Sequence, residues 1–380
     1  MNNVIFLTGA TGLVGSNLIP RVLRNDNTSQ LVLLVRGRGE RDARRRLTDL
    51  LAHVSPELVS DDVKRRITVL EGDITAERLG LPDSLYTDLS SSVTHIIHSA
   101  ASVQFQLPLE EARRINVSGT SKVMQLAQHA MSAGKLQRVA YVSTAYVSGK
   151  RSGDVFEDEL DCGQDFANTY ERSKFESERH VRSLMKELPI TVFRPSIIVG
   201  DSLSGRTLTF NVLYFPLKLI HRGLLRILPG SHHTPTDVVP VDYVCDALCH
   251  IFLNTNKGIG KTYHLTAGSS RATTAGEVVD LAVEFFNETS ATRRLREVRF
   301  VPRHLYRAVA RLMNGWAKKA LELMSIYESY LCVQRIYSDL NTRDALRDSH
   351  IAPPLFKTYY HSILQYCVDS DWGRRPRLAA

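Results

Sequence analysis

The sequence predicts an α/β fold in which a doubly wound parallel sheet carries a smaller, mainly helical lobe on its C-terminal side. Short segments rich in Val, Ile and Leu alternate with segments of helical period, and a glycine-rich turn follows the first of them. The alternation stops after residue 268. Strands that helices cover on both faces are continuously apolar, and regular strand–helix alternation builds a parallel sheet.

Seven segments are short and apolar enough to be buried strands. Helical period fills the chain between them, as in residues 14–25 and 119–133. The second of these helices would turn one apolar stripe toward the sheet, made of Val123, Leu126, Ala127 and Ala130. The predicted strands are residues 4–8, 31–35, 67–70, 95–98, 138–143, 190–194 and 262–266.

Two stretches interrupt the pattern and predict a second lobe. Residues 203–237 are an insertion before a helix that begins near Val241, and residues 275–286 and 303–323 have the pattern of helices. Insertions of this kind cover the carboxyl edge of a parallel sheet, where ligands bind. We therefore expect a cofactor-binding sheet domain of residues 1–200 with 236–268, and a substrate lobe of residues 201–235 with 269–380.

The composition excludes several functional classes. The chain has 380 residues and a formal net charge of +8. No helix-turn-helix spacing, zinc finger or RNA-binding aromatic motif accompanies its arginines, so nucleic acid is not the expected partner. The five cysteines are scattered without a Cys-x-x-Cys pair. This predicts neither a disulfide framework nor a metal site, and it favours a reducing cytoplasm.

Targeting and membrane signals are not expected either. The first predicted strand begins at the N-terminus, where it leaves no room for a secretory leader. The most apolar internal stretch, residues 208–228, contains Pro216, Lys218 and Arg222, which would be costly in a bilayer core. We therefore predict no transmembrane segment.

A glycine triplet lies between the first predicted strand and the first predicted helix. Glycines at three-residue intervals let the backbone approach a pyrophosphate closely, and the helix that follows supplies N–H groups and a favourable dipole. A glycine triplet alone is weak evidence, but its place directly after an N-terminal strand favours a Rossmann-type dinucleotide site. The residues predicted to bind the cofactor here are Gly9, Thr11, Gly12, Leu13, Val14 and Gly15.

The end of the second predicted strand favours NADPH over NADH. An acidic residue at this place would accept hydrogen bonds from the ribose hydroxyls of NAD, but the sequence has Arg36 instead. A guanidinium group can bind a 2′-phosphate through two hydrogen bonds. Arg44, Arg45 or Arg46 on the next helix would add a second charge, and Arg46 is the one we predict. Exposed arginines in ordinary ion pairs are the alternative.

The ends of the third and fourth predicted strands would complete the adenosine site. Asp73 can accept a hydrogen bond from the adenine amino group, and Ile74 can offer its backbone N–H. Ala100 and Ala101 are small enough to let the adenosine lie over the edge of the sheet. Plain turns are the alternative for both places.

Tyr170 and Lys174 are four residues apart, which places a phenol and an ammonium group on the same face of a helix. A phenol titrates near pH 10, and an adjacent cation would lower that pKa and make the phenol a better acid near neutrality. Lys174 could also hold the nicotinamide ribose. A Tyr–Lys pair of this spacing is common by chance, so its context decides its meaning.

Three further residues would complete the reaction site. Thr144 follows the fifth predicted strand and could bond to a substrate carbonyl oxygen, whereas Ser143 would turn to the opposite face and pack. Asn116 is predicted as a water-binding member of a proton relay. Pro195, at the end of the sixth predicted strand, would help anchor the carboxamide through backbone groups.

These features, in this order, resemble the extended short-chain dehydrogenase/reductase superfamily over residues 3–268. The local sequence is most similar to that of fatty acyl-CoA reductases and of the thioester reductases that release carrier-bound chains in lipid, polyketide or nonribosomal peptide metabolism. The runs that carry the resemblance are residues 98–103, 116–120, 141–147, 173–178, 194–201 and 239–244.

The resemblance implies hydride transfer from NADPH to the carbonyl carbon of an acyl thioester. Tyr170 and Thr144 would stabilise the oxyanion, and Tyr170 would donate a proton. The hemithioacetal would then release an aldehyde, which a second hydride transfer could carry on to the alcohol. The acyl donor is either coenzyme A or an acidic carrier protein. Because the chain begins at the first strand with its own Met1, we expect a free-standing reductase.

Two other functions compete with this interpretation. The first is an epimerase, dehydratase or hydroxysteroid dehydrogenase of the same superfamily, because these share the Thr, Tyr and Lys site. Arg36 and the apolar insertion argue for an exchangeable NADPH and an apolar substrate instead. The second is a non-catalytic NADP-binding sensor that keeps only the glycine turn, and the intact Tyr170 and Lys174 argue against it.

The predicted lobe combines apolar and basic patterns. The insertion from Leu208 to Leu225 is apolar enough to line an acyl tunnel, but core packing is the safer expectation. In residues 303–323, an apolar stripe would be accompanied by a basic face that could dock a carrier protein, coenzyme A phosphates or, peripherally, an anionic membrane. A solvated face is the alternative. The stripe is Leu305, Val309, Leu312, Trp316 and Leu323, and the basic residues are Arg303, Arg307, Arg311, Lys318 and Lys319.

Overall fold

A parallel sheet of seven strands forms the centre of the part of the chain that the computed structural model describes, namely residues 3–37, 40–54, 65–210, 212–254, 258–289, 294–312, 324 and 327–374. The strand order is β12-β7-β5-β4-β1-β2-β3, so the direction of winding reverses between β1 and β4. The strands are β1 (Val4–Thr8), β2 (Gln30–Val35), β3 (Ile67–Glu71), β4 (His95–His98), β5 (Arg138–Val142), β7 (Ile190–Pro195) and β12 (Thr262–Leu265).

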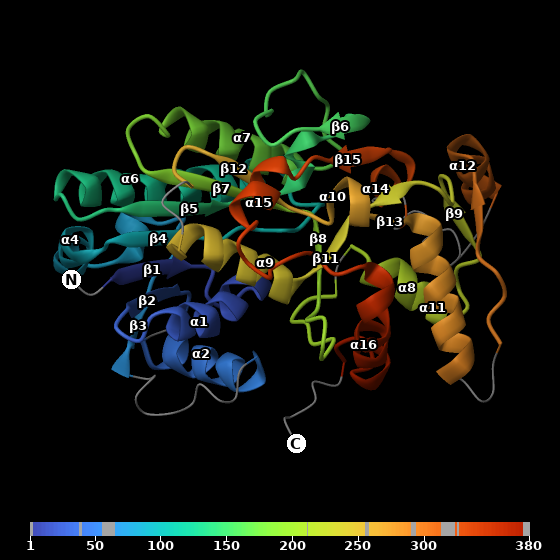
Figure 1. Cartoon of the computed structure of the whole chain (residues 1–380), viewed down its shortest axis with the longest axis horizontal. Coiled ribbons are helices and arrows are strands. Elements are labelled where there is room, and N and C mark those ends of the chain that lie inside the picture. Colours follow the sequence, from blue (N-terminus) through green and yellow to red (C-terminus); the bar gives the residue numbers. More distant parts are fainter. Residues whose placement is uncertain are drawn as a thin grey trace.

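Helices cover both faces of this sheet (Figure 1). One face packs against α1 (Leu13–Asn25), α2 (Glu40–Val54) and α9 (Val241–Cys249), and the other against α4 (Asp83–Ser92), α6 (Gly119–Ser132) and α7 (Thr169–Ser183). The structure confirms the predicted doubly wound fold. It also buries the whole predicted stripe of α6, that is Val123, Leu126, Ala127 and Ala130.

A second apolar core lies beside the sheet and contains the predicted insertion and tail (Figure 1). Tyr214, Leu217, Ile220 and Leu225 of the insertion are all buried in it, so these residues pack the lobe, as the sequence favours. The helices of this core are α8 (Tyr214–His221), α11 (Ala275–Thr289), α12 (Arg303–Leu312), α14 (Glu328–Cys332) and α16 (Phe356–Asp369), and β9 (Ile227–Pro229) pairs with β14 (Arg299–Val301).

Short elements complete the fold. The strand pairs among them are β8 (Ile197–Val199) with β11 (Val238–Pro240), and β10 (Pro235–Thr236) with β13 (Thr273–Thr274). The remaining helical turns are α5 (Leu109–Arg113), α10 (Gly268–Arg271), the 3-10 turns η2 (Glu77–Gly80) and η4 (Ala145–Ser148), and the π-helical turns η3 (Arg114–Ser118) and η5 (His250–Asn254). Among the described residues, no helix is both long and apolar enough to cross a membrane.

Residues 335–351 return from the lobe to the sheet, and we call them the return segment. Its strand β15 (Arg335–Tyr337) pairs with β6 (Gly153–Val155), and its helix α15 (Leu340–Ala345) lies against β12. The buried carboxylate of Glu157 accepts hydrogen bonds from the N–H groups of Asn341 and Thr342. Leu346 then enters the core beneath the sheet. The predicted boundaries of the two domains stay a prediction. They assign residues 335–351 to the lobe and do not include their contact with the sheet.

The predicted helix over residues 303–323 is only partly within the described chain. Helix α12 ends at Leu312, and Trp316, Lys318, Lys319 and Leu323 lie outside the described residues. Of the predicted apolar stripe, Val309 is half-buried but Leu305 and Leu312 are exposed, and Tyr306 is a fully buried side chain of α12.

Candidate active site

The glycine turn between β1 and α1 is shaped by close backbone packing. Gly9 has a φ of +76°, and a Cβ atom there would lie 2.7 Å from the main-chain nitrogen of Ala100. A Cβ atom on Gly15 would lie 2.1 Å from the Gly9 carbonyl oxygen. Gly12 precedes α1 without a side-chain cap, and no acidic residue lies in the first turn of the helix. The turn therefore offers backbone N–H groups and a positive dipole end, which fit the pyrophosphate of a dinucleotide.

The neighbouring strand end lies beside this turn. Ala100 and Ala101 follow β4, and the Ala100 N–H donates to the Thr8 hydroxyl at 3.4 Å. Ile74 packs so closely on α6 that a Cβ atom on Gly119 would lie 2.8 Å from its Cδ1 atom. The other residues predicted to bind the cofactor lie on the turn or in the first turn of α1, and they are Thr11, Gly12, Leu13 and Val14.

A cavity opens at the ends of β2 and β3. Its volume is about 660 Å³, and Arg36, Arg44 and Asp73 are among the residues that line it. Arg36 is exposed, and Arg46 on α2 donates a hydrogen bond to its main-chain carbonyl oxygen. The Asp73 carboxylate accepts a hydrogen bond of 2.8 Å from the N–H of Thr75. Cationic and carboxylate groups therefore meet where the adenosine half of a dinucleotide would lie.

Thr144 and Tyr170 meet at the carboxyl rim of the sheet. Thr144 lies just beyond β5, and Tyr170 lies in the first turn of α7, which Asn168 caps by accepting a hydrogen bond of 2.9 Å from the Glu171 N–H. The side chain of Thr144 lies close enough to the Tyr170 phenol to lower the pKa of that phenol. The Thr144 hydroxyl donates to the carbonyl oxygen of Pro195 at 3.4 Å. The structure thus brings three of the predicted site residues together.

The predicted effect of Lys174 on Tyr170 is wrong in this structure. Burial raises the pKa of Tyr170 to about 12, and the nearby Thr144 side chain only partly offsets it. Lys174 Nζ donates instead to the Tyr141 hydroxyl and to the Val142 carbonyl oxygen, both at 2.9 Å. Burial also lowers the pKa of Lys174 to about 7, although the nearby Glu178 carboxylate opposes this change. Tyr170 is therefore a fully protonated phenol near neutral pH.

Asn116 is held by several protein contacts, and its predicted role in binding water stays a prediction. Its side-chain oxygen accepts from the Ser102 N–H at 2.8 Å, and its amide group donates to the Ser102 carbonyl oxygen and to Ser173 Oγ. Its main-chain carbonyl accepts hydrogen bonds from the hydroxyls of Ser177 and Thr120. These protein contacts use both amide protons, so Asn116 joins α7 to the loop after β4.

Aromatic rings cover the rim. Phe105 stacks on Tyr170 with ring centroids 5.8 Å apart, and Tyr330 of α14 also stacks on Phe105, with ring centroids 5.7 Å apart. Tyr146 lies 4.7 Å from Tyr330. The Tyr330 hydroxyl donates to the buried carboxylate of Glu171 at 2.8 Å, so the lobe is bonded to the residue next to Tyr170. These rings place an aromatic cover beside the Tyr170 phenol.

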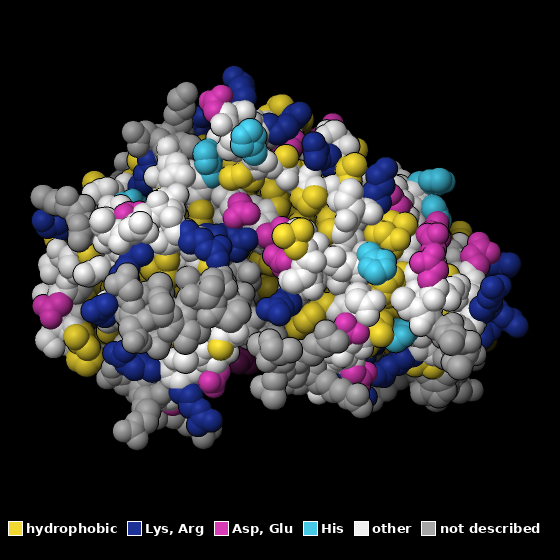
Figure 2. Space-filling model, turned by 60° about the horizontal axis from the view of Figure 1, so that its bottom comes forward, with side chains coloured by type: hydrophobic (Ala, Val, Ile, Leu, Met, Phe, Trp, Pro, Cys, Tyr) yellow, Lys and Arg dark blue, Asp and Glu magenta, His cyan; other side chains and the backbone are white. Residues whose placement is uncertain are grey.

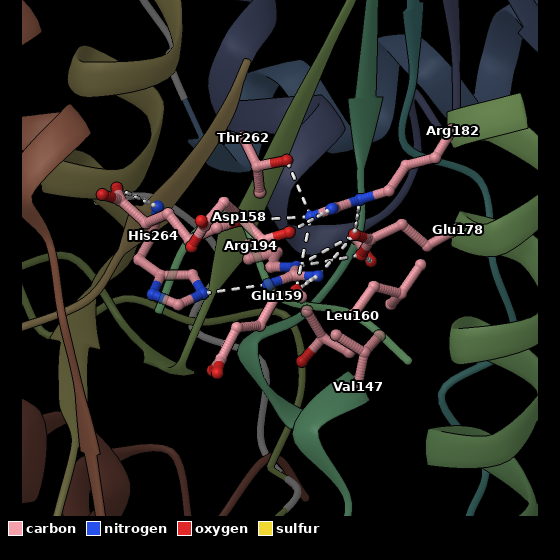
Figure 3. Close-up of polar contacts among 12 residues, drawn as sticks. Val147, Asp158, Glu159, Leu160, Glu178, Arg182, Arg194, Thr262 and His264 are labelled. Atoms are coloured by element: carbon pink, nitrogen blue, oxygen red, sulfur yellow. Dashed lines mark hydrogen bonds and ion pairs between the residues drawn. The ribbon is translucent and has the colours of Figure 1, made fainter. Parts of the chain in front are cut away.

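A buried ionic network lies beneath the rim (Figure 3). Arg194 on β7 pairs with Glu178 on α7 at 2.7 Å, and both side chains are almost completely buried. Arg182 and the Ser143 hydroxyl donate to the same carboxylate at 2.9 and 2.5 Å. His264 on β12 lies 3.2 Å from Arg194. The ionic network therefore ties three strand ends to α7, the helix that carries Tyr170 and Lys174.

The sequence did not single out several of these residues. Glu178 lies one helical turn after Lys174, and strand alternation places Tyr141 on the same face as Ser143, so both could have been found from spacing. Phe105 and Tyr330 had no local signal, because their stacking depends on how the distant α14 packs. The Arg194 side chain was also missed, since only its backbone was considered.

The predicted basic face of α12 is partly used inside the lobe. Arg303 and Arg307 both pair with Glu328, a buried residue of α14, the second pair at 3.1 Å. Arg311 is exposed at the end of α12. On the face shown in Figure 2, basic side chains are interspersed with acidic ones. Docking through this helix would therefore depend on Arg311, since the other two arginines stabilise the contact between α12 and α14.

Comparison with known proteins decides the family. Residues 7–248 match the sequence profile of an NAD-binding family described as male sterility protein. The chain belongs to this family. The resemblance expected from the sequence is thereby confirmed, and a nicotinamide cofactor is the ligand that the family name implies.

The relatives of this chain include nonribosomal peptide synthetases and fatty acyl-CoA reductases. The chain is 31% identical over 275 residues to the nonribosomal peptide synthetase asaC of Aspergillus flavus, a match that covers 69% of this chain and 26% of the synthetase. It is 29% identical over 275 residues to the fatty acyl-CoA reductase wat of Drosophila melanogaster, which covers 64% of this chain and 53% of that reductase. The matches thus span between a quarter and about half of these relatives.

Solved structures support the same family assignment. The terminal R domain of the myxalamid PKS-NRPS pathway superposes with a TM-score of 0.82 at 25% identity, covering 99% of this chain and 93% of that domain. The reductase domain of a nonribosomal peptide synthetase from Mycobacterium tuberculosis has a TM-score of 0.70 at 24% identity, covering 98% and 92%, and shows the likeness of fold.

Proposed function

We propose that this chain is an NADPH-dependent reductase that converts an acyl thioester to an aldehyde. The observation that carries the proposal is the pairing of Thr144 and Tyr170 at the carboxyl rim, the same edge of the sheet at which the glycine turn follows β1. Family membership supports it, because the relatives include a fatty acyl-CoA reductase and reductase domains of peptide synthetases. The proposed site residues keep the roles that the sequence predicts, except for the effect of Lys174 on the Tyr170 pKa.

The chemistry of the chain's own residues is simple. Bound NADPH would supply the hydride to the carbonyl carbon of the thioester. The carbonyl oxygen gains negative charge as the hydride adds, and two fixed hydroxyls stabilise it, those of Thr144 and Tyr170. Tyr170 then donates its proton to this oxygen, and the hemithioacetal releases the thiol to leave the aldehyde. Because its pKa is raised to about 12, the Tyr170 phenol holds that proton throughout the neutral range.

The proposed preference for NADPH rests on Arg36 and Arg46. Arg36 and Arg44 line the cavity at the end of β2, and Arg46 donates a hydrogen bond to the main-chain carbonyl oxygen of Arg36, so cationic side chains are available near the expected place of a 2′-phosphate. The proposed partner is a thioester of coenzyme A or of an acidic carrier protein. An epimerase or a non-catalytic sensor would not need an aromatic cover over Tyr170, which suits an apolar acyl chain.

A single experiment tests the proposal. NADPH oxidation would be followed with a panel of acyl-CoA and acyl-carrier thioesters, and the products would be identified by mass spectrometry. We expect oxidation with at least one thioester and an aldehyde or alcohol of the same chain length. Purified protein that retains NAD and oxidises NADPH with none of the thioesters would reject the proposal.

A further inference from the structure

The amine of Lys174 is held in a buried polar pocket under the rim. Only 3% of the residue is exposed. Its Nζ atom lies 2.9 Å from the Tyr141 hydroxyl oxygen and 2.9 Å from the Val142 carbonyl oxygen. The same atom lies 4.5 Å from the centroid of the Tyr141 ring, close enough for a cation–π contact. Tyr141 thus contacts Lys174 both through its hydroxyl and through its ring.

The hydrogen bonds beyond Tyr141 run in one direction. The Tyr141 hydroxyl donates to Ser177 Oγ at 2.8 Å, and the Ser177 hydroxyl donates to the main-chain carbonyl of Asn116 at 2.9 Å. A hydroxyl has one proton, so a hydroxyl that donates to its neighbour turns an oxygen lone pair to the group on its other side. The carbonyl at the end of this chain lies in the π-helical turn η3. Tyr141 therefore presents an acceptor to Lys174.

The charged and titratable groups around Lys174 come from three elements. Glu178 lies on α7 and favours the ammonium form, whereas His98 on β4 is kept neutral because burial, aided by the charge of Lys174, lowers its pKa to about 3. Burial raises the pKa of the Tyr141 phenol on β5 well above its ordinary value, so it too is neutral. The ammonium form of Lys174 thus depends on the one carboxylate of Glu178 and on neutral acceptors.

We propose that Tyr141 is a positioning residue whose hydroxyl, oriented by Ser177 and the Asn116 carbonyl, holds Lys174 as an ammonium group at the end of β5. Nothing in the proposed chemistry requires Tyr141 to touch the substrate. Its effect on turnover rests on the proposed function, but its effect on the charge of Lys174 does not.

The first test measures that charge directly, without substrate or cofactor. Protein labelled with 13C at lysine Cε would be titrated by NMR, and the signal lost in Lys174→Arg identifies Lys174. Tyr141→Phe removes one hydrogen bond to a charged group, so the Lys174 midpoint should fall by about one pH unit. Ser177→Ala should lower it less, because it only frees the Tyr141 proton. An unchanged midpoint in Tyr141→Phe would overturn the proposal.

A matched control is available in the lobe. The buried Tyr359 donates its hydroxyl to the Val238 carbonyl oxygen at 3.1 Å, far from Lys174 along the chain and in the second core. Tyr359→Phe makes the same chemical change at a similarly buried position. It should leave the Lys174 midpoint unchanged, and an equal shift in both variants would mean that the effect is general and would overturn the proposal.

The second test uses the pH dependence of kcat and KM. If the ammonium form is needed, activity is present below the Lys174 pKa and is lost as the pH rises through it. Tyr141→Phe should move this basic limb to lower pH and reduce kcat about threefold midway between the two midpoints and up to about tenfold at pH above both, with little change in KM. Lower thermal stability with an unmoved limb would indicate a merely structural role. If the unaltered protein reduces no thioester, the proposed function fails, while the NMR titration still decides the role of Tyr141.

Discussion

The carboxyl rim and the layer beneath it are built from the same helix but differ in how their polar groups are bonded. At the rim, Tyr170 lies close to Thr144 and is covered by the Phe105 ring. One helical turn further along α7, Lys174 has two protein acceptors and is buried. The Thr144 hydroxyl can turn to a substrate at the cost of one weak bond to Pro195, whereas Lys174 cannot leave its place without breaking both of its hydrogen bonds.

The charged groups of the buried layer have many hydrogen-bond partners. Glu178 alone accepts hydrogen bonds from Arg182, Arg194 and Ser143. Buried charges are tolerated only when they are paired and hydrogen-bonded, so each partner in this layer stabilises the others. If the proposed function holds, this site separates two tasks: the rim would react, and the layer below would fix geometry and protonation. Variants in the two places should therefore affect different measurements.

The largest effect is expected from Tyr170→Phe at the rim. Loss of the proton donor and of one oxyanion contact should reduce kcat by about a hundredfold to ten-thousandfold, with little change in stability. Steady-state NADPH oxidation measures kcat, and fluorescence titration with NADPH checks that binding is intact. Near-normal turnover would show that the rim phenol is not the proton donor.

Glu178→Gln should lower the free energy of unfolding, an effect that we expect of the buried layer and not of the rim. The variant leaves the buried guanidinium of Arg194 without its carboxylate, and breaking a buried pair costs about 3–5 kcal/mol in the free energy of unfolding. Urea denaturation measures the change. Glu176→Gln is the control, because Glu176 lies on the same helix and pairs with Arg113 nearer the surface, where a pair contributes about 1 kcal/mol or less. Equal losses in both variants would contradict the comparison.

Arg36→Glu tests an exposed charge at the end of β2, in the cavity where the adenosine half of the cofactor is expected. Replacing a cation by an anion should raise the KM for NADPH about ten- to a hundredfold and hardly change that for NADH, since only NADPH carries the 2′-phosphate. The thermal midpoint should stay the same because the side chain is exposed. Lys186→Glu, exposed before the amino end of β7, is the control. An unchanged preference for NADPH would rule out Arg36 as its determinant.

The smallest effect is expected from Arg311→Glu on α12. A single exposed charge contributes about 0.5–1 kcal/mol to a contact, so the KM for a carrier-bound thioester should rise about two- to fivefold. The KM for a free aldehyde should not change. Arg307 is unsuitable for this test, because its pair with Glu328 stabilises the lobe. A similar rise for both substrates would dismiss docking through α12.

The sheet was predictable from the sequence because its strands are encoded locally. The apolar runs 4–8 and 95–98 match β1 and β4 residue for residue, and the others differ by one residue at an end. The glycine turn was equally predictable, since only glycine fits the contact of Gly9 with Ala100. These features depend on neighbours in the sequence or on a close approach of two backbone segments that only glycine allows.

The lobe and the buried layer were less predictable because they depend on distant partners. The return segment forms β15 only because β6 is there to pair with it, and helix α16 was not anticipated. Helix α12 turns Tyr306 inward, where the periodicity had favoured Leu305 and Leu312. The Tyr–Lys spacing correctly placed both residues on α7, but spacing alone does not show that Lys174 would turn to Tyr141.

The return segment makes the two parts of the protein interdependent. Glu157 receives hydrogen bonds from His264, Asn341 and Thr342, so a fragment that ended before residue 335 would bury a carboxylate deprived of most of its donors. His264 would likewise lose the carbonyl oxygen of Ser338. The chain should therefore melt as one cooperative unit, and attempts to express the sheet half by itself should yield insoluble protein.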